Sequence, residues 1–139
     1  MTKKGISEER REHKRFKPYD AAYVFFDFYG EAIGQITDIS EGGIGFLYAG
    51  YKDWSDGLDT VDITIADYIF SIKDIPVKAV WESNIPNDDS SISVGTKRCG
   101  IQFGYLIADQ KSQLTNFIEV QALKAEHQKR TDMGSRLEL

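Results

Sequence analysis

Two short motifs in this chain contain the residue types that bind a charged, hydrogen-bonding ligand. Arg11 and Arg15 form an RxxxR motif near the N-terminus, and Asp38, Ser40 and Gly43 form a DxSxxG motif further along. The planar guanidinium group of arginine donates paired hydrogen bonds to phosphate or to the O6 and N7 acceptors of guanine, and its face stacks on bases. The first motif therefore predicts binding of a ligand that is anionic, guanine-bearing, or both.

The DxSxxG motif supplies complementary groups. The carboxylate of Asp38 can accept hydrogen bonds from the N–H donors of guanine, and the hydroxyl of Ser40 can donate to a phosphate. Gly42 and Gly43 permit a tight turn whose backbone N–H groups can approach an anion. Taken alone, RxxxR also fits a solvated charged tail, and DxSxxG also fits an ordinary turn between strands. The order and separation of the two motifs favour a ligand site.

The composition limits the class of protein. A chain of 139 residues with 41% hydrophobic residues predicts one domain with one core, and no apolar run is long enough to span a bilayer. With one cysteine, no apolar signal segment and a net charge of −5, we expect a cytoplasmic protein that binds neither DNA nor RNA. Residues 1–17 nevertheless carry seven basic and three acidic side chains, which indicates a local anion site.

The pattern of apolar residues predicts the elements that position these motifs. We expect a flexible basic arm at 1–17, a folded unit at 18–126 and a polar tail at 127–139. Helical spacing of apolar residues between Leu114 and Ala125 predicts a helix that Asp109 can cap. Alternating patterns predict seven strands, at 21–29, 32–38, 43–49, 61–66, 68–73, 77–81 and 99–103. Many short strands separated by turns are typical of a β-sandwich or barrel.

A hairpin formed by the first two strands would bring the motifs together. Centred on Gly30, its register opposes large and small residues: Val24 with Ile36, Phe26 with Gly34, and Phe28 with Ala32. The same register places Asp38 beside Ala22 and Ser40 close to Asp20, at the end where the arm enters. We therefore expect the arginines of the arm to lie near the DxSxxG motif.

The two motifs in this order, followed by Gly100 and Phe103 in a late strand before a helix, resemble the PilZ domain family over roughly residues 8–120. That family binds the bacterial second messenger cyclic di-GMP. The resemblance implies an all-β fold, a six-stranded antiparallel β-barrel with a C-terminal α-helix. It also implies the ligand-binding residues: Arg11 and Arg15 from the arm, Asp38 and Ser40 from the barrel, and Gly43 shaping the loop, with Arg10 as a peripheral candidate beside the first arginine. Gly42 in the turn and Arg98 before the late strand are further peripheral candidates.

The expected function is that of a non-enzymatic receptor whose arm orders over cyclic di-GMP and signals to a partner protein in trans. The alternative is a PilZ-fold adaptor that acts by protein contact without binding nucleotide. The sequence has no histidine cluster, no paired carboxylates at metal-ligand spacing and no phosphate-binding loop, so we expect no catalysis, metal or cofactor. His13, within the arm, is expected to be solvated. The sequence leaves open the stoichiometry, the oligomeric state and the regulated process, among motility, adhesion and polysaccharide secretion.

Overall fold

The computed structural model describes residues 13–26, 33–49, 54–55, 57–65, 70–84 and 96–137, with the side chains of 84 and 133–137 excepted. These residues form six strands and one helix. The elements are β1 (Ala22–Phe25), β2 (Ile33–Ser40), β3 (Gly43–Tyr48), β4 (Thr60–Ile65), β5 (Ser71–Asn84), β6 (Lys97–Phe103) and α2 (Ala108–Leu137).

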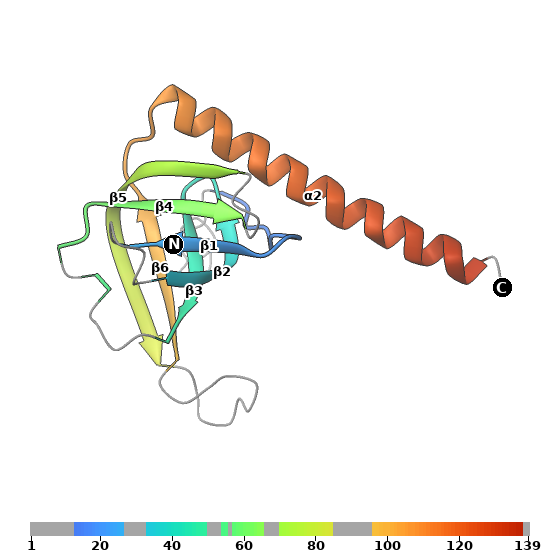
Figure 1. Cartoon of the computed structure of the whole chain (residues 1–139), viewed down its shortest axis with the longest axis horizontal. Coiled ribbons are helices and arrows are strands. Elements are labelled where there is room, and N and C mark those ends of the chain that lie inside the picture. The colour runs from blue at the N-terminus through green and yellow to red at the C-terminus, as the bar shows by residue number, and fades with distance from the viewer. Residues whose placement is uncertain are drawn as a thin grey trace, which may run out of the picture.

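The six strands close into a barrel in the order β1-β2-β3-β6-β5-β4, and every neighbouring pair is antiparallel. Figure 1 shows α2 leaving one end of this barrel. Side chains from all six strands fill the interior, among them the fully buried Val24, Ile39, Phe46, Ile63 and Ile72 and the thiol of Cys99. The expected six-stranded antiparallel barrel with a C-terminal helix is confirmed.

Two of the seven expected strands join in one long strand, β5, which contains residues 71–73 of the first and residues 77–81 of the second. Residues 71–76 of β5 pair with β4, and the strand pairs with β6 from Val77 onward. Pro76 lies at this change of partner, where its missing N–H does not interrupt a continuous ladder. The N–H of Val77 donates to the carbonyl of Asp59 at 2.9 Å, so the backbone pairing continues past the proline.

The register expected for the first hairpin is wrong by two residues. Val24 pairs with Gly34 rather than with Ile36, while Phe28 and Ala32 lie outside the described residues. A Cβ atom at Gly34 would lie 2.4 Å from Cδ2 of Phe46, so glycine is needed where this large ring enters the core beside Val24. A shift of two residues keeps every side chain on its expected face, because side chains alternate with a period of two.

A bulge in β2 creates the surface on which the DxSxxG motif lies. Ile36 pairs with Phe46 but Asp38 pairs with Gly45, so Thr37 is one extra residue in β2. A single inserted residue reverses the alternation of faces along a strand. Ile36 and Ile39 are therefore both buried in the core, while Asp38 and Ser40 share the opposite face and line a pocket.

Helix α2 begins at Ala108, two residues before the start that an N-cap at Asp109 predicts, and it ends much later than expected. Oε1 of Gln110 accepts the N–H of Ile107 at 3.1 Å, and Nε2 donates to the carbonyls of Lys73 and Asp74, both at 2.9 Å. Gln110, rather than Asp109, thus closes the first turn and attaches it to β5.

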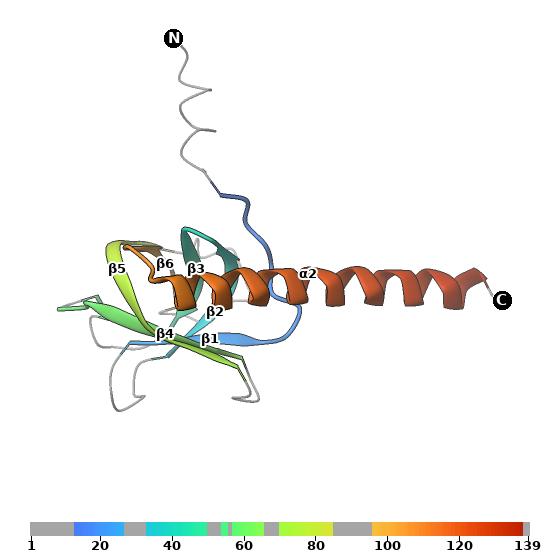
Figure 2. The ribbon, with the colours of Figure 1, turned by 90° about the horizontal axis from the view of Figure 1, so that it is seen from above.

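The helix then runs on to Leu137, through most of the segment 127–139 that the sequence predicts as a polar tail. Leu114, Phe117 and Ile118 pack against the barrel, whereas all side chains of residues 123–132 are exposed. In Figures 1 and 2 the second half of α2 projects beyond the barrel. Good helix formers and pairs such as Glu126 with Arg130, at 2.7 Å, favour its helical conformation. No helix among the described residues is long and apolar enough to cross a membrane.

Candidate functional site

The arm meets the barrel directly beside the DxSxxG motif. The N–H and carbonyl groups of Phe16 exchange two hydrogen bonds of 2.8 Å with those of Ile39, the residue between Asp38 and Ser40. The ring of Phe16 also packs against the core cluster. The expectation that the arm enters at this end of β2 is confirmed, but the hairpin register behind it is wrong. In the structure it is Phe16 that pairs with this end of β2.

This bridge brings one arginine of the RxxxR motif to the first residue of the DxSxxG motif. Nη1 of Arg15 lies 3.6 Å from Oδ2 of Asp38, and the two side chains are 41% and 34% exposed. An ion pair so accessible to water contributes little stability, so a ligand can replace either partner at low cost. Arg10 and Arg11 lie outside the described residues.

The carboxylate of Asp38 lies across a residue that has no side chain. A Cβ atom added to Gly45, its partner on β3, would lie 2.8 Å from Oδ1 of Asp38. Gly45 therefore provides the space that lets the carboxylate lie along the sheet and face Arg15. The motif pattern did not single out Gly45, because its role depends on the pairing of β2 with β3.

Ser40 and Gly43 flank the turn between β2 and β3. The N–H of Gly42 donates to Oγ of Ser40 at 3.1 Å, and this hydroxyl donates to the carbonyl of Gly43 at 3.4 Å. A Cβ atom at Gly43 would lie 2.3 Å from the backbone oxygen of Ile101, so β3 and β6 can approach closely only with glycine here. The N–H of Phe103 further ties β6 to the carbonyl of Gly42 at 2.8 Å.

His13 lines the pocket while its side chain stays 42% exposed, so the expected solvated residue also lies at the site. A Cβ atom at Gly42 would lie 2.7 Å from Cδ2 of His13, which shows how closely the imidazole packs on the turn. Nδ1 of His13 is 3.8 Å from Oε2 of Glu41. The pattern of charges could not place this residue, because the contact depends on the bridge at Phe16.

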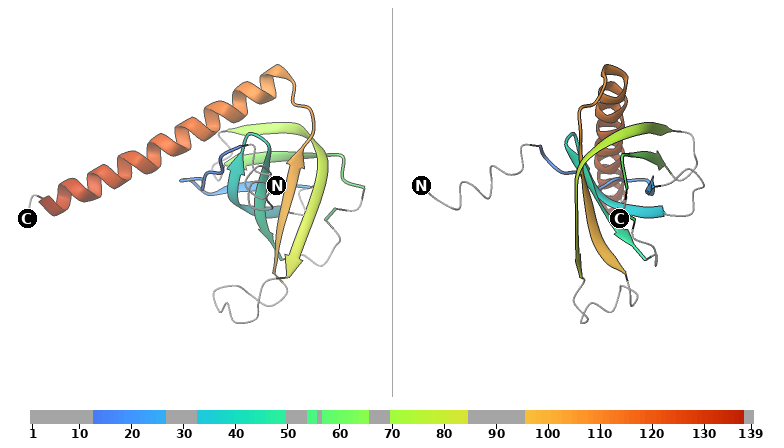
Figure 3. Two further views of the ribbon diagram at one scale, coloured as in Figure 1. Left: turned by 180° about the vertical axis from the view of Figure 1, so that it is seen from behind. Right: turned by 90° about the vertical axis from the view of Figure 1, so that its left-hand side faces the viewer.

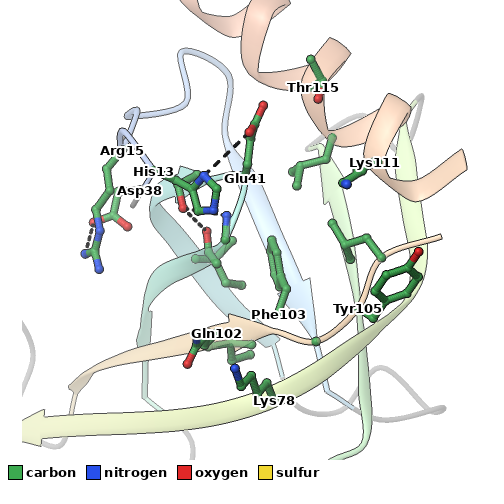
Figure 4. Close-up of a pocket in the computed structure, with 18 of the residues that line it drawn as sticks. His13, Arg15, Asp38, Glu41, Lys78, Gln102, Phe103, Tyr105, Lys111 and Thr115 are labelled. Carbon is green, nitrogen blue, oxygen red and sulfur yellow. Dashed lines mark hydrogen bonds and ion pairs between the residues drawn. The ribbon is translucent and has the colours of Figure 1, made fainter. Parts of the chain in front are cut away.

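These groups form one side of a cavity of about 780 Å³ between the arm, the β2–β3 turn, β5, the end of β6 and the first turns of α2. Figure 4 shows Lys78, Gln102, Tyr105 and Lys111 across from Arg15, Asp38 and Glu41. Within the described part of the chain, neither Lys78 nor Lys111 has a carboxylate partner. Arg98, a peripheral candidate, does not line this cavity. The lining consists of His13, Arg15, Asp38, Ser40, Glu41, Gly42, Gly43, Ile44, Lys78, Trp81, Ile101, Gln102, Phe103, Gly104, Tyr105, Leu106, Lys111, Leu114 and Thr115.

A flat aromatic surface forms part of the cavity wall. The ring of Trp81, on β5, lies so close to Gly100 of β6 that an added Cβ atom would be 2.1 Å from the indole. Trp81 is nevertheless 43% exposed. A partly exposed indole held against a strand can stack with a nucleobase.

The cavity combines cations, a carboxylate, a hydroxyl and an indole on the surface of a six-stranded barrel. The sequence profile of the PilZ domain matches residues 9–120. The chain belongs to the PilZ domain family. Within the described residues no group of three or more histidine, cysteine or acidic side chains could hold a metal ion.

Solved structures share the PilZ fold at low sequence identity. The PilZ domain of YcgR from Escherichia coli with c-di-GMP is 17% identical, with a TM-score of 0.58, covering 87% of this chain and 98% of that one. A K. pneumonia MrkH–c-di-GMP complex is 22% identical, with a TM-score of 0.61, covering 86% of this chain and 55% of that one. The Bacillus subtilis inhibitor of motility MotI/DgrA is 16% identical, with a TM-score of 0.52, covering 83% of this chain and 52% of that one.

The chain thus spans about half the length of MrkH and MotI. No curated protein matches the sequence significantly. Sequence reasoning missed Gly45, Lys78, Tyr105 and Lys111 as residues of the site, and it preferred a solvated His13 to one that contacts a phosphate. Only the Gly100 and Phe103 pattern pointed toward this wall of the cavity.

Proposed function

We propose that this chain is a non-enzymatic receptor for cyclic di-GMP and that its N-terminal arm orders over the ligand. The observation that carries the proposal is the meeting of Arg15 with Asp38, 3.6 Å apart, at a cavity of about 780 Å³. Membership of the PilZ family supports this choice of ligand.

The charges of the cavity fit a ligand with two phosphates. Arg15 from the arm, Lys78 from the barrel and Lys111 from the helix supply cations on different sides of the cavity. Charge-assisted hydrogen bonds to phosphate are about twice as strong as neutral ones. The turn at Gly42 and Gly43 lines the same cavity as Arg15.

A ligand that carries only phosphate fits the cavity poorly, because the cavity also contains carboxylates. Asp38 and Glu41 would repel an anion that offers no donors, whereas the N–H groups of a guanine edge can donate to Asp38. Trp81 offers a surface on which a guanine can stack. The site therefore favours a ligand that carries both phosphate and guanine.

Binding would change the arm. With cyclic di-GMP present, Arg15 can give up its solvent-exposed ion pair with Asp38 and bind a phosphate or a guanine instead. Arg11 can then bind the same ligand. Ordering the arm costs conformational entropy, which the new charge-assisted bonds must outweigh. The ordered arm would then be recognised by a partner protein in trans rather than by DNA or RNA, consistent with the net charge of −5.

Titration calorimetry with cyclic di-GMP, GTP and GMP tests the proposal. We expect the wild-type chain to bind cyclic di-GMP in preference to the mononucleotides, and Arg11→Ala and Arg15→Ala each to weaken binding by about tenfold or more. Equal affinity for all three nucleotides, or unchanged affinity in both variants, would contradict it. The same titration gives the stoichiometry, and amide NMR of residues 8–17 tests whether the arm orders.

A further inference from the structure

A partly buried polar contact joins residues 16–20, the root of the arm, to α2. The N–H of Asp20 donates to Oε1 of Gln121 at 2.6 Å, and Nε2 of Gln121 donates to Oδ2 of Asp20 at 3.0 Å. Nζ of Lys124 donates to the same carboxylate oxygen at 2.7 Å. Gln121 is only 1% exposed, so breaking these bonds would leave a buried amide without partners.

The segment from Phe16 to Asp20 is therefore held at both ends. Phe16 is hydrogen-bonded to Ile39 on β2, and Asp20 is bonded to Gln121 on α2. Between them, the hydroxyl of Tyr19 donates to Oε1 of Gln128 at 3.2 Å. Figure 2 shows this part of the chain passing beside the middle of α2 before it enters β1.

On the basis of the proposed function, we propose that Gln121 is a positioning residue for ligand binding. With Lys124 it holds the root of the arm on α2, so that Arg15, one residue before the bridge at Phe16, faces Asp38. Gln121 does not line the cavity and acts only through the arm.

The physical basis is preorganisation. With the root held, only the residues before Phe16 must order when the ligand binds. With the root free, residues 16–20 must order as well, and each newly fixed residue costs backbone conformational entropy, which lowers the affinity. Ligand affinity then depends on the contact between Asp20 and Gln121, although Gln121 does not line the cavity. By linkage, a bound ligand strengthens the attachment of the arm to α2.

Helix α2 offers a matched control. Gln110 and Gln121 are both buried glutamines on this helix, but Gln110 bonds to Lys73 and Asp74 and does not touch the arm. We expect Gln121→Met to weaken binding of cyclic di-GMP by about tenfold. Gln110→Met should stay within about twofold of the wild type. Lys124→Gln changes an exposed side chain and should give a smaller loss in the same direction.

Two further measurements separate positioning from a general loss of stability. In an Arg15→Ala background the effect of Gln121→Met on affinity should shrink, because the position of the arm matters less once its arginine is absent. Without ligand, amide hydrogen exchange at Phe16 and Asp20 should be faster in Gln121→Met than in the wild type and unchanged in Gln110→Met.

Wild-type affinity in both Gln121→Met and Lys124→Gln would overturn this inference, as would an equal loss of affinity in Gln110→Met. If Gln121→Met does not fold, an unchanged affinity of Lys124→Gln is sufficient to overturn it. Failure of the wild-type chain to bind cyclic di-GMP would instead overturn the proposed function. The hydrogen-exchange result would then still show whether Gln121 holds the arm.

Discussion

At the scale of single residues, two glycines of β3 have different roles that substitution should separate. In Gly45→Ala the new Cβ atom would meet Oδ1 of Asp38 at 2.8 Å, and that carboxylate is the movable end of a partly exposed side chain. The carboxylate can turn away at little cost to the fold. We expect the free energy of unfolding to change by less than about 1 kcal/mol, while the affinity for cyclic di-GMP falls by about tenfold. Urea unfolding and calorimetry measure the two effects.

Gly43→Ala is the contrasting variant. Its Cβ atom would meet the backbone oxygen of Ile101 at 2.3 Å, and a strand backbone cannot rotate away as a carboxylate can. We expect it to destabilise the fold by about 1–3 kcal/mol, as overpacking in a core does. Equal loss of stability in both variants would contradict the role assigned to Gly45.

Trp81 provides a direct optical test of the cavity. The chain has two tryptophans, and Trp54 is only 5% exposed whereas Trp81 is 43% exposed. We expect cyclic di-GMP to change the fluorescence of Trp81 by stacking, and Trp81→Leu to weaken binding by about 1–3 kcal/mol. Trp81→Phe, which keeps a ring, should retain most of the affinity. An unchanged affinity in Trp81→Leu would show that no base stacks there.

At the scale of elements, the contact between the arm and α2 should depend on pH. The hydrogen bond from Lys124, followed by that from Gln121, holds the pKa of Asp20 below its ordinary value of 3.8. A carboxyl group with a lowered pKa stabilises the fold above its unfolded pKa, and this contribution is lost as the pH falls through the folded value. The contact should therefore be fully formed above about pH 5 and weaken below about pH 4.

Urea unfolding of the wild type and of Asp20→Asn measures this effect. The difference in their free energies of unfolding should be constant from pH 7 to 5 and shrink toward pH 3. In a Lys124→Gln background the pH-dependent part should largely disappear, because its main cause is removed. If the difference between the two free energies of unfolding stayed constant down to pH 3, or grew, it would contradict the role assigned to the Asp20 carboxylate.

The elements also show what the sequence could and could not predict. Alternating patterns located all six strands, but β5 was predicted as two strands, 68–73 and 77–81, because no local pattern shows that one strand changes partner at Pro76. The helix was expected to end near His127, because its apolar stripe ends there. The helix continues because good helix formers and ion pairs such as Glu126 with Arg130 favour a helical conformation even where no side chain packs against the barrel.

At the scale of the whole molecule, the site depends on contacts that no local pattern contains. Sequence motifs pointed to Arg15, Asp38, Ser40 and Gly43, because each of these residues belongs to a short motif of fixed spacing. Lys78 and Lys111 come from β5 and α2, and only closure of the barrel brings them to the same cavity. Figure 3 shows this end of the barrel, with the start of α2 above β5 and β6. Prediction from sequence could therefore identify one side of the cavity and not the other.

The barrel also contains an internal reporter of its own stability. Cys99, the one cysteine of the chain, is fully buried on β6. Burial, followed by the charge of Glu82, raises the pKa of its thiol to about 11. Because the thiolate is the reactive form, the native protein should be inert to a thiol reagent at neutral pH, and labelling should report opening of the barrel.

This reporter tests binding at the level of the whole fold. A ligand that binds only the folded chain stabilises it by RT ln(1 + [L]/Kd), so cyclic di-GMP at 100 times its Kd should add about 2.7 kcal/mol and slow labelling of Cys99 by about 100-fold. In Asp38→Ala, the same ligand concentration should give little protection. The same variant in urea should be labelled as fast as the unfolded wild type, which controls for the reagent. If ligand that saturates the site left the labelling rate of the wild type unchanged, Cys99 would be exposed by a local opening of β6 that leaves the cavity intact. That opening would contradict the view that β6 forms one rigid unit with the β2–β3 turn, to which the N–H of Phe103 ties it.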